Sequence, residues 1–221
     1  MIQARYRQDY DGEFVVLSTE IVNGVKQEVR DWIPNPIENY HISHRAAVIG
    51  SSVDREIFNY TRLQRHRGGL LGKKKLQTYG TGNLWQDMRF DFFVSTDSEV
   101  LSQIVEHGYD QSATIYTNAR HIVEMPGRFY LIPFRPMLDN LATNIYVAAF
   151  DGHQEIFLLG YTNETVGQTS YWQRDVDSLI KTYTNVKFTF VGVEQNIPDL
   201  WKKHSHVDCW DYRKFVTYCD V

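Results

Sequence analysis

Small polar side chains gather at four points where an apolar run of the sequence ends. These points are Gly50-Ser51-Ser52, Ser95-Thr96-Asp97, Thr117-Asn118 and Tyr161-Thr162-Asn163. If the runs are parallel strands, their carboxyl ends share one edge of a sheet, which is where open α/β folds bind ligands. Hydroxyls, amides and helix N-termini there suit the oxygens of phosphate and ribose. The same residue types also serve as helix caps, so a nucleotide site and a set of caps remain alternatives.

A second candidate site is a basic run that contains glycines. Its cations are Arg62, Arg65, Arg67, Lys73, Lys74 and Lys75, in a chain whose formal net charge is −4. Cations beside glycines can contact the phosphates of a nucleotide or of nucleic acid at close range. A solvated loop is the other explanation of the run. The negative overall charge excludes a uniformly basic nucleic-acid binder, although it leaves room for a local patch.

The common cofactor and metal motifs are absent from the sequence. It contains no GxGxxG, and the glycines and lysines of 68–75 do not form GxxxxGK[ST]. Its two cysteines, Cys209 and Cys219, have no CxxC or Cys/His spacing that would hold zinc, so we expect no metal and no resident cofactor. The chain begins without an apolar signal-like stretch and has no run long enough to span a membrane. We therefore expect a cytoplasmic protein with reduced cysteines.

Alternating strand and helix patterns must position these residues. Apolar runs predict strands near 45–52, 76–79, 90–95, 113–116, 129–132, 155–160 and 186–191, with helices at 53–64, after the hydroxyls at 95–96, and at 140–150 and 170–182. Strands that are apolar throughout favour a Rossmann-like α/β fold with a mainly parallel sheet and helices on both faces. Asn23-Gly24 predicts an N-terminal antiparallel hairpin, which we expect to extend the sheet edge or cover one face.

The chain of 221 residues fits one domain. We expect residues 1–40 to form a hairpin appendage, 45–195 the nucleotide-binding core, and 196–221 a C-terminal tail.

The order and spacing of five segments resemble the bacterial sialyltransferases of the family that contains the Campylobacter enzymes. The segments are Arg45–Ser52, Leu76–Asn83, Phe90–Ser98, Ala113–Asn118 and Asn140–Gly160. The resemblance implies a Rossmann-like domain that binds a nucleotide-sugar donor and inverts its anomeric centre without a metal. It covers about residues 45–165 and is one of pattern, with few identities.

The resemblance also implies roles for particular residues. It places Gly50, Ser51 and Ser52 near the donor phosphate, Asn83, Thr96 and Asp97 near its sugar or nucleoside, Thr143 and Asn144 against the nucleotide, and Tyr161 and Tyr171 beside the departing phosphate. Phenolic donors at that point would stabilise leaving-group charge.

Two features depart from the family pattern. Where the family has Gly-Ile-Asp after the last strand, this chain has Gly160-Tyr161-Thr162, so a carboxylate is missing. No histidine lies between His153 and His204, so the general base is open among Glu164, Asp175, His204 and His206.

The sequence thus predicts a glycosyltransferase that moves a sugar from a nucleotide donor to a hydroxyl acceptor. The basic run allows the acceptor to be hydroxymethylated double-stranded DNA, as for a relative of phage DNA-modifying enzymes acting in the host cytoplasm. A carbohydrate acceptor is the alternative. Two other classes stay open: a non-catalytic nucleotide or nucleic-acid binding module, and a nucleotide-processing hydrolase on the same scaffold.

Overall fold

Strands that are buried on both faces form the centre of the molecule. The computed structural model describes residues 2–7, 13–34, 43–50, 59, 61–64, 76–134, 137–161 and 171–220. In β3 (Arg45–Ile49), Ala46 and Val48 enter one hydrophobic core, and Ala47 and Ile49 enter the core on the opposite face. Because side chains alternate along a strand, burial on both faces requires the continuous apolar run that the sequence has here.

Eight strands form one parallel sheet in the order β10-β9-β8-β3-β4-β5-β6-β7, and every neighbouring pair is parallel. Besides β3, they are β4 (Gln77–Thr81), β5 (Phe92–Val94), β6 (Thr114–Thr117), β7 (Tyr130–Leu131), β8 (Glu155–Leu159), β9 (Lys187–Val191) and β10 (Val207–Trp210). The predicted α/β class with a parallel sheet is confirmed.

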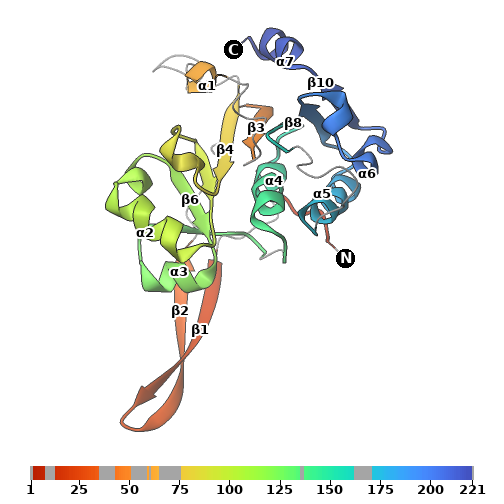
Figure 1. Ribbon diagram of the computed structural model, residues 1–221. Helices are drawn as coiled ribbons and strands as arrows, with labels where there is room; N and C mark the ends of the chain where they lie inside the picture. Colours follow the sequence, from red (N-terminus) through yellow and green to blue (C-terminus); the bar gives the residue numbers. More distant parts are fainter. Residues whose placement is uncertain are drawn as a thin grey trace.

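Helices cover both faces of this sheet (Figure 1). One face packs against α4 (Asn140–Phe150), α5 (Tyr171–Thr182) and the short α6 (Asp199–Lys202); the other packs against α2 (Ser98–Glu106), α3 (Ala119–Glu124) and α7 (Tyr212–Cys219). Short helical turns complete the described elements: α1 (Thr61–Gln64), η3 (Leu84–Gln86), η4 (Tyr109–Gln111) and η5 (Glu194–Asn196). Of the helix expected at 53–64, the structure describes α1 and Asn59, which is not helical; 53–58 and 60 lie outside the described residues.

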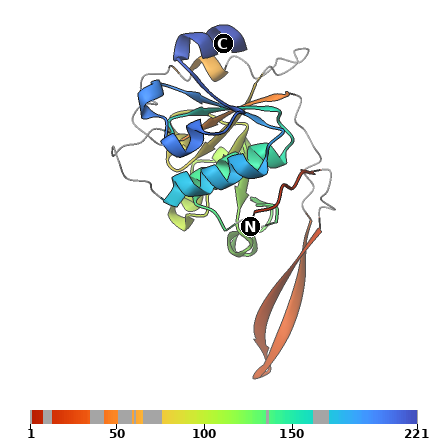
Figure 2. The same cartoon turned by 90° about the vertical axis from the view of Figure 1, so that its right-hand side faces the viewer.

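The N-terminal hairpin forms a sheet of its own. β1 (Glu13–Val22) and β2 (Val25–Pro34) pair antiparallel over their full length, around a turn in which Asn23 and Gly24 both have positive φ, 54° and 81°. Neither strand joins the eight-stranded sheet, and the hairpin projects away from the body (Figures 1 and 2). The expectation that it extends the sheet edge or covers a face is therefore wrong, because the outer strands of the large sheet are β7 and β10.

The C-terminal residues expected to form a tail are part of the body. β10 extends the parallel sheet beyond β9, and Phe215 and Cys219 of α7 are buried in the core on the α2 side. Both cysteines are free, as the sequence suggested. The sheet thus continues past the boundary expected at residue 195.

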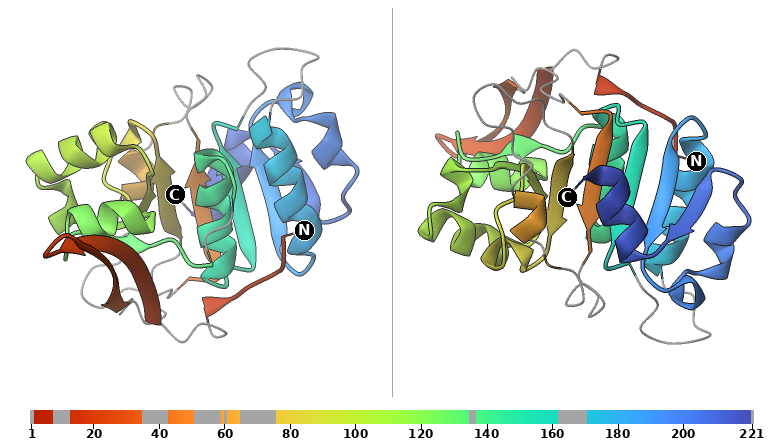
Figure 3. Two further views of the ribbon diagram at one scale, coloured as in Figure 1. Left: turned by 90° about the horizontal axis from the view of Figure 1, so that it is seen from below. Right: turned by 90° about the horizontal axis from the view of Figure 1, so that it is seen from above.

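A buried polar cluster fixes the N-terminal segment to the body. Arg7 is only 7% exposed and forms an ion pair with Asp151, which accepts a 2.7 Å hydrogen bond from the Tyr79 hydroxyl. His153 contacts the same hydroxyl at 2.8 Å and Ser43 O at 2.9 Å. Arg7 precedes the hairpin and Ser43 follows it, so one cluster connects described residues from both sides of the hairpin. Nearby, the first residues run beside the end of α5 (Figure 3).

Candidate functional site

The strand order reverses beside β3. From β3 the chain builds the sheet outwards through β4 to β7, and it then crosses by α4 to β8 on the other side of β3. In open α/β sheets the crevice beyond the carboxyl ends of the strands at such a switch point is the ligand site. The candidate site therefore lies where β3 ends at Gly50 and β8 ends at Gly160.

The two glycines bring the ends of these strands into backbone contact. Gly50 N donates a 2.8 Å hydrogen bond to Leu159 O. A Cβ atom on Gly50 would lie 2.4 Å from Gly160 O and 3.1 Å from the Tyr161 ring, so only glycine fits. Gly160 itself has a φ of +71°, a conformation that glycine adopts without strain. The tight approach therefore depends on the absence of a side chain at Gly50.

Tyr161 follows directly but is not presented to a ligand in this geometry. Its side chain is fully buried, and its hydroxyl donates a 3.0 Å hydrogen bond to Leu141 O in the first turn of α4. Burial raises the pKa of Tyr161 above its ordinary value, and a hydrogen bond with Asn144 opposes that rise only in part. The proposed contact of Tyr161 with a leaving phosphate stays a prediction that would need the ring to move.

Asn144 lies beneath the switch point, and its side-chain oxygen accepts no hydrogen bond from the described residues. It is fully buried in α4, and its Nδ2 donates a long, 3.4 Å hydrogen bond to Ile49 O. Among the described residues, its Oδ1 has no hydrogen-bond partner. Leaving a buried acceptor unpaired costs about 1–3 kcal/mol, so such a group needs an explanation. Thr143, next to it, is also buried, and its hydroxyl donates to Leu138 O at 3.3 Å.

Helix caps account for part of the polar edge. Asp97 accepts hydrogen bonds from the backbone of α2, Asn118 from α3 and Asp139 from α4. The hydroxyl cap predicted for α2 is therefore wrong: the carboxylate of Asp97 takes that role, and Ser95 Oγ accepts from Asp97 N instead. Because carboxylates already occupy the positive ends of α2 and α4, these helix N-termini are poor phosphate sites.

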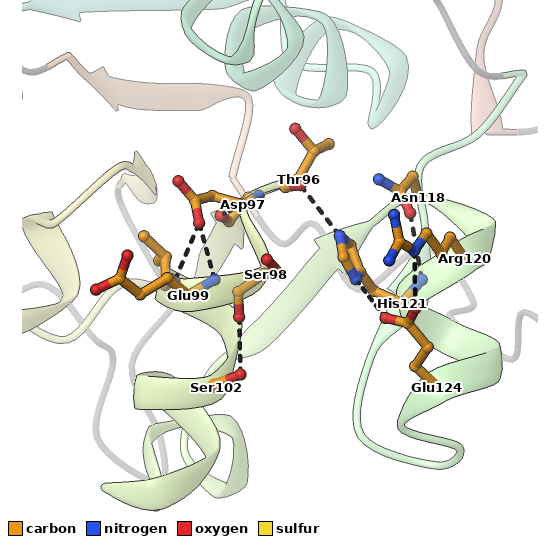
Figure 4. A network of polar contacts seen from close by, with 11 residues as sticks. Thr96, Asp97, Ser98, Glu99, Ser102, Asn118, Arg120, His121 and Glu124 are labelled. Atoms are coloured by element: carbon orange, nitrogen blue, oxygen red, sulfur yellow. Dashed lines mark hydrogen bonds and ion pairs between the residues drawn. The ribbon is translucent and has the colours of Figure 1, made fainter.

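Side-chain contacts tie these caps together along the edge. Thr96 donates a 2.8 Å hydrogen bond from its hydroxyl to Asn140 Oδ1 at the start of α4. On its other side, Thr96 O lies 3.1 Å from Nε2 of the buried His121, whose Nδ1 lies 3.0 Å from Glu124 (Figure 4). Sequence patterns did not single out His121, because it follows a strand end by several residues inside a short helix. Asn83, by contrast, is exposed after β4 and makes no side-chain cap.

A cavity of about 770 Å³ adjoins the start of α4 on the helical face. Its lining comes from the N-terminal segment, from the chain before α4, from α4 and from α5: Ile2, Gln3, Arg5, Phe134, Met137, Leu138, Tyr146, Asp175, Ser178, Lys181 and Thr182. Asp175 Oδ2 accepts a 3.0 Å hydrogen bond from Asp139 N, so this carboxylate joins the cavity to the helix that carries Asn144. Asp175 was one of the four general-base candidates in the sequence.

The two C-terminal histidines lie at the opposite edge. His206 O accepts a hydrogen bond from Phe188 N, at the amino end of β9, and His206 Nε2 contacts Ile180 O at 2.9 Å. His204 Nε2 lies 2.7 Å from Asp177 Oδ1, within hydrogen-bond distance. Because β10 begins just after His206 and runs parallel to β9, both histidines are at the amino edge, and the structure does not bring them together with Gly50.

The other predicted site residues are divided between the surface and the part of the chain that is not described. Tyr171 is 85% exposed at the start of α5. Arg62 is exposed in α1. The remaining predicted residues lie outside the described ranges: Ser51, Ser52, Glu164, Arg65, Arg67, Lys73, Lys74 and Lys75.

Comparison with known proteins found fold neighbours among solved structures. A variant of the α-2,3/8-sialyltransferase CstII has 13% sequence identity and a TM-score of 0.44, over 66% of this chain and 80% of its own. CstII from Campylobacter jejuni in complex with cytidine-5'-monophosphate has 14% identity and a TM-score of 0.43, over 66% and 78%. CST-II with a trisaccharide acceptor and CMP has 12% identity and a TM-score of 0.41, over 66% and 80%.

These neighbours are sialyltransferases, the kind of protein that the sequence pattern resembled. None of them supports the suggested relationship to phage DNA-modifying enzymes. No protein-family model matches the chain, and no curated protein matches it.

The described residues show neither a metal-binding cluster nor a membrane-spanning helix. They contain no group of three or more His, Cys, Asp or Glu side chains arranged to hold a metal ion. Nor does any helix in the described ranges have the length and apolar character needed to cross a membrane.

Proposed function

We propose that this chain is a glycosyltransferase that binds a nucleotide-sugar donor at the switch point between β3 and β8. The observation that carries the proposal is the unpaired Oδ1 of Asn144, which is buried directly below the close approach of Gly50 and Gly160. A hydroxyl or amino group of the donor would supply the missing hydrogen. The pattern shared with sialyltransferases supports the same assignment, and it also suggests Thr143, Thr96 and Asn83 as donor contacts.

In the proposed reaction a hydroxyl of the acceptor attacks the anomeric carbon as the bond to the donor phosphate breaks. A base takes the hydroxyl proton, and the nucleotide leaves with the electron pair. Asp175 is the base candidate best placed for this role, because it faces the cavity and contacts the start of α4. The nucleotide sugar is a substrate in this scheme, and no resident cofactor or metal takes part.

The acceptor has two candidate classes. A carbohydrate hydroxyl fits the cavity beside Asp175, which combines aromatic, apolar and charged groups. DNA as acceptor depends on the basic run after Arg62, and binding through it would weaken strongly between low and moderate salt.

The test compares two buried side-chain amides, Asn144 near the carboxyl edge of the sheet and Gln77 at its amino edge. Gln77, at the amino end of β4, also has a side-chain oxygen without a donor among the described residues. We expect Asn144→Ala to weaken nucleotide-sugar binding about tenfold, the value of one hydrogen bond, with little loss of stability. Gln77→Ala should leave binding unchanged. Calorimetric titration with UDP-, CMP- and GDP-sugars measures both, and equal affinities in the two variants would contradict the proposed site.

A nucleotide-binding module without chemistry is the second candidate. The observation in its favour is Tyr161, whose hydroxyl is committed to Leu141 O instead of facing a leaving group. Slow hydrolysis of a bound donor in the absence of acceptor would indicate a transferase. Binding without any turnover would indicate the module, and hydrolysis of plain nucleotides would indicate a hydrolase.

A further inference from the structure

The β1–β2 hairpin stands away from the body with both edges open (Figures 1 and 2). Among the described strands, β1 and β2 pair only with each other. At the tip, Ile21, Val22 and Val25 are 70%, 40% and 60% exposed. A two-stranded hairpin is marginally stable in water, and an open edge readily pairs with a further strand. These features point to a strand from another molecule as the missing neighbour.

The turn determines which backbone groups such a strand would meet. Val22 and Val25 flank the two-residue turn and form a hydrogen-bonded pair, so the next pair, Ile21 and Lys26, is not hydrogen-bonded within the hairpin. Hydrogen-bonded and non-hydrogen-bonded pairs alternate along a hairpin, so the pair of Glu28 and Thr19 is also not hydrogen-bonded within it. Both residues therefore direct their N–H and C=O groups outward from β2.

Lys26 and Glu28 also carry opposite charges at this edge. Both side chains are exposed, and neither has an ion-pair partner among the described residues. They flank Gln27 symmetrically, so an antiparallel copy of β2 centred on Gln27 would place each Lys26 opposite the partner's Glu28. The described tip of β1 offers no such match, because its only charged residue is Glu20.

We propose that two copies of this chain associate through their β2 edges around a two-fold axis at Gln27. The product is a four-stranded antiparallel sheet in the order β1-β2-β2-β1. Outward backbone groups of Lys26 and Glu28 hydrogen-bond across the axis, and two symmetric ion pairs fix the register. Such an isologous contact closes on itself and gives a dimer and not a fibre. The proposal does not depend on the enzymatic function.

Charge reversal tests the register. Lys26→Glu places two Glu–Glu contacts across the axis, and Glu28→Lys places two Lys–Lys contacts there. Opposite charges on facing strands stabilise a sheet and like charges destabilise it, so we expect each variant to raise the dimer dissociation constant at least about tenfold. Mixing the two variants should restore association as a heterodimer, because every contact across the axis is again between opposite charges. The double variant should likewise dimerise as the natural chain does.

Sedimentation velocity over a concentration series at low salt gives the extent of dimerisation for these four samples and for the natural chain. Within one hairpin, Lys26 lies opposite Ile21 and Glu28 opposite Thr19, so neither substitution breaks an internal ion pair, and circular dichroism should be unchanged. A natural chain that stays monomeric at high micromolar concentration would overturn the proposal. So would a dimer that both single variants form equally well.

Cross-linking gives a second, independent measurement. Gln27 lies on the proposed axis in a pair whose Cα atoms are about 4.5 Å apart, within the range that a disulfide bridges. Gln27→Cys should therefore form a disulfide-linked dimer on mild oxidation. Glu20→Cys, opposite Gln27 on the far strand, is the matched control and should not. The natural chain, with Cys209 and Cys219 free, provides the background. Equal cross-linking of the two variants would contradict the register.

Discussion

Gly50 shows how one residue type controls the candidate site. Its Cα lies so close to β8 that any Cβ would meet the backbone oxygen of Gly160 at 2.4 Å. Backbone atoms cannot rotate away as a flexible side chain can. The absence of a side chain at Gly50 therefore allows the ends of the two strands to come together.

Replacing Gly50 with alanine should both destabilise the fold and abolish nucleotide-sugar binding. We expect a loss of about 3 kcal/mol in the free energy of unfolding, as for other substitutions that force extra atoms into a packed interior. Gly82→Ala is the control: its φ of +66° makes alanine strained, but no atom lies within 4 Å of the added Cβ. Urea denaturation and donor titration should show a moderate stability loss for Gly82→Ala with binding retained. Retained binding in Gly50→Ala would mean that the ligand lies elsewhere.

Individual residues were predicted from the sequence with uneven success. The strand ends near Gly50 and Gly160 were predicted correctly, because they can be recognised locally, whereas the nucleotide contact assigned to Asn144 stays a prediction. The burial of Tyr161 and the location of His206 could not be predicted from the sequence, since they depend on which elements pack above and beside them. Asp97 was named as a ligand contact, and the structure uses its carboxylate as a helix cap.

At the scale of elements, α5 is joined to the turn before β10 by a charged contact. Asp177 of α5 is mostly buried and pairs with His204 at 2.7 Å and with Lys181 at 2.6 Å. Burial works to raise the pKa of Asp177, but the hydrogen bonds from His204 and Lys181 outweigh it, and the pKa is lowered below its ordinary value. A lowered pKa means that the folded state favours the ionised carboxylate.

This contact should give the protein an acid-sensitive component of stability. Because the folded pKa is below the unfolded one, the contribution is present above about pH 4 and disappears as the pH falls through the folded pKa. We expect Asp177→Asn to cost about 1–3 kcal/mol at pH 6 and much less at pH 3. Asp199→Asn, at a carboxylate that is 97% exposed, should cost little at either pH. A deficit for Asp177→Asn that stays constant from pH 6 to pH 3 would contradict the assignment.

The elements that sequence patterns missed are short or polar. β10 has only four residues, one of them acidic, and its strand character comes from pairing with β9. α7 has two adjacent charged residues, Arg213 and Lys214, among aromatic and polar ones, and its buried side follows from contact with the sheet. Long apolar strands and the Asn23-Gly24 turn were predicted correctly because their signals are local. Whether a hairpin joins a sheet is not a local property, and that expectation failed.

At the scale of the whole molecule, one buried cluster connects segments that are far apart in the chain. Arg7 contacts Asp151 and Tyr116, and the cluster extends through Tyr79 and His153 to Ser43. Burial alone would lower the pKa of Arg7, but its neighbours outweigh that effect, so the pKa is raised and the guanidinium stays charged. Arg7 and Ser43, the described residues on the two sides of the hairpin, are thereby joined to the centre of the body.

Removing this guanidinium should release the N-terminal segment from the body of the protein. Arg7→Met leaves the Asp151 carboxylate buried without its cation, for which we expect a loss of about 3–5 kcal/mol in the free energy of unfolding. Arg5→Met changes an exposed cation on the same segment and should cost below about 1 kcal/mol. Urea denaturation gives both values, and limited proteolysis should cut the Arg7 variant first near its N-terminus. Equal stabilities of the two variants would contradict a central role for the cluster.

The position of β3 at the centre of the sheet has a consequence for the newly made chain. One of its neighbours, β4, follows it closely, but the other pairing, between Arg45 and Glu155, spans 110 residues. At ordinary rates of translation, the ribosome needs on the order of 10 s to make that stretch. During this time one edge of the central strand waits for a partner that has not yet been synthesised. The projecting hairpin, made entirely from neighbouring residues, is complete long before the sheet that carries it.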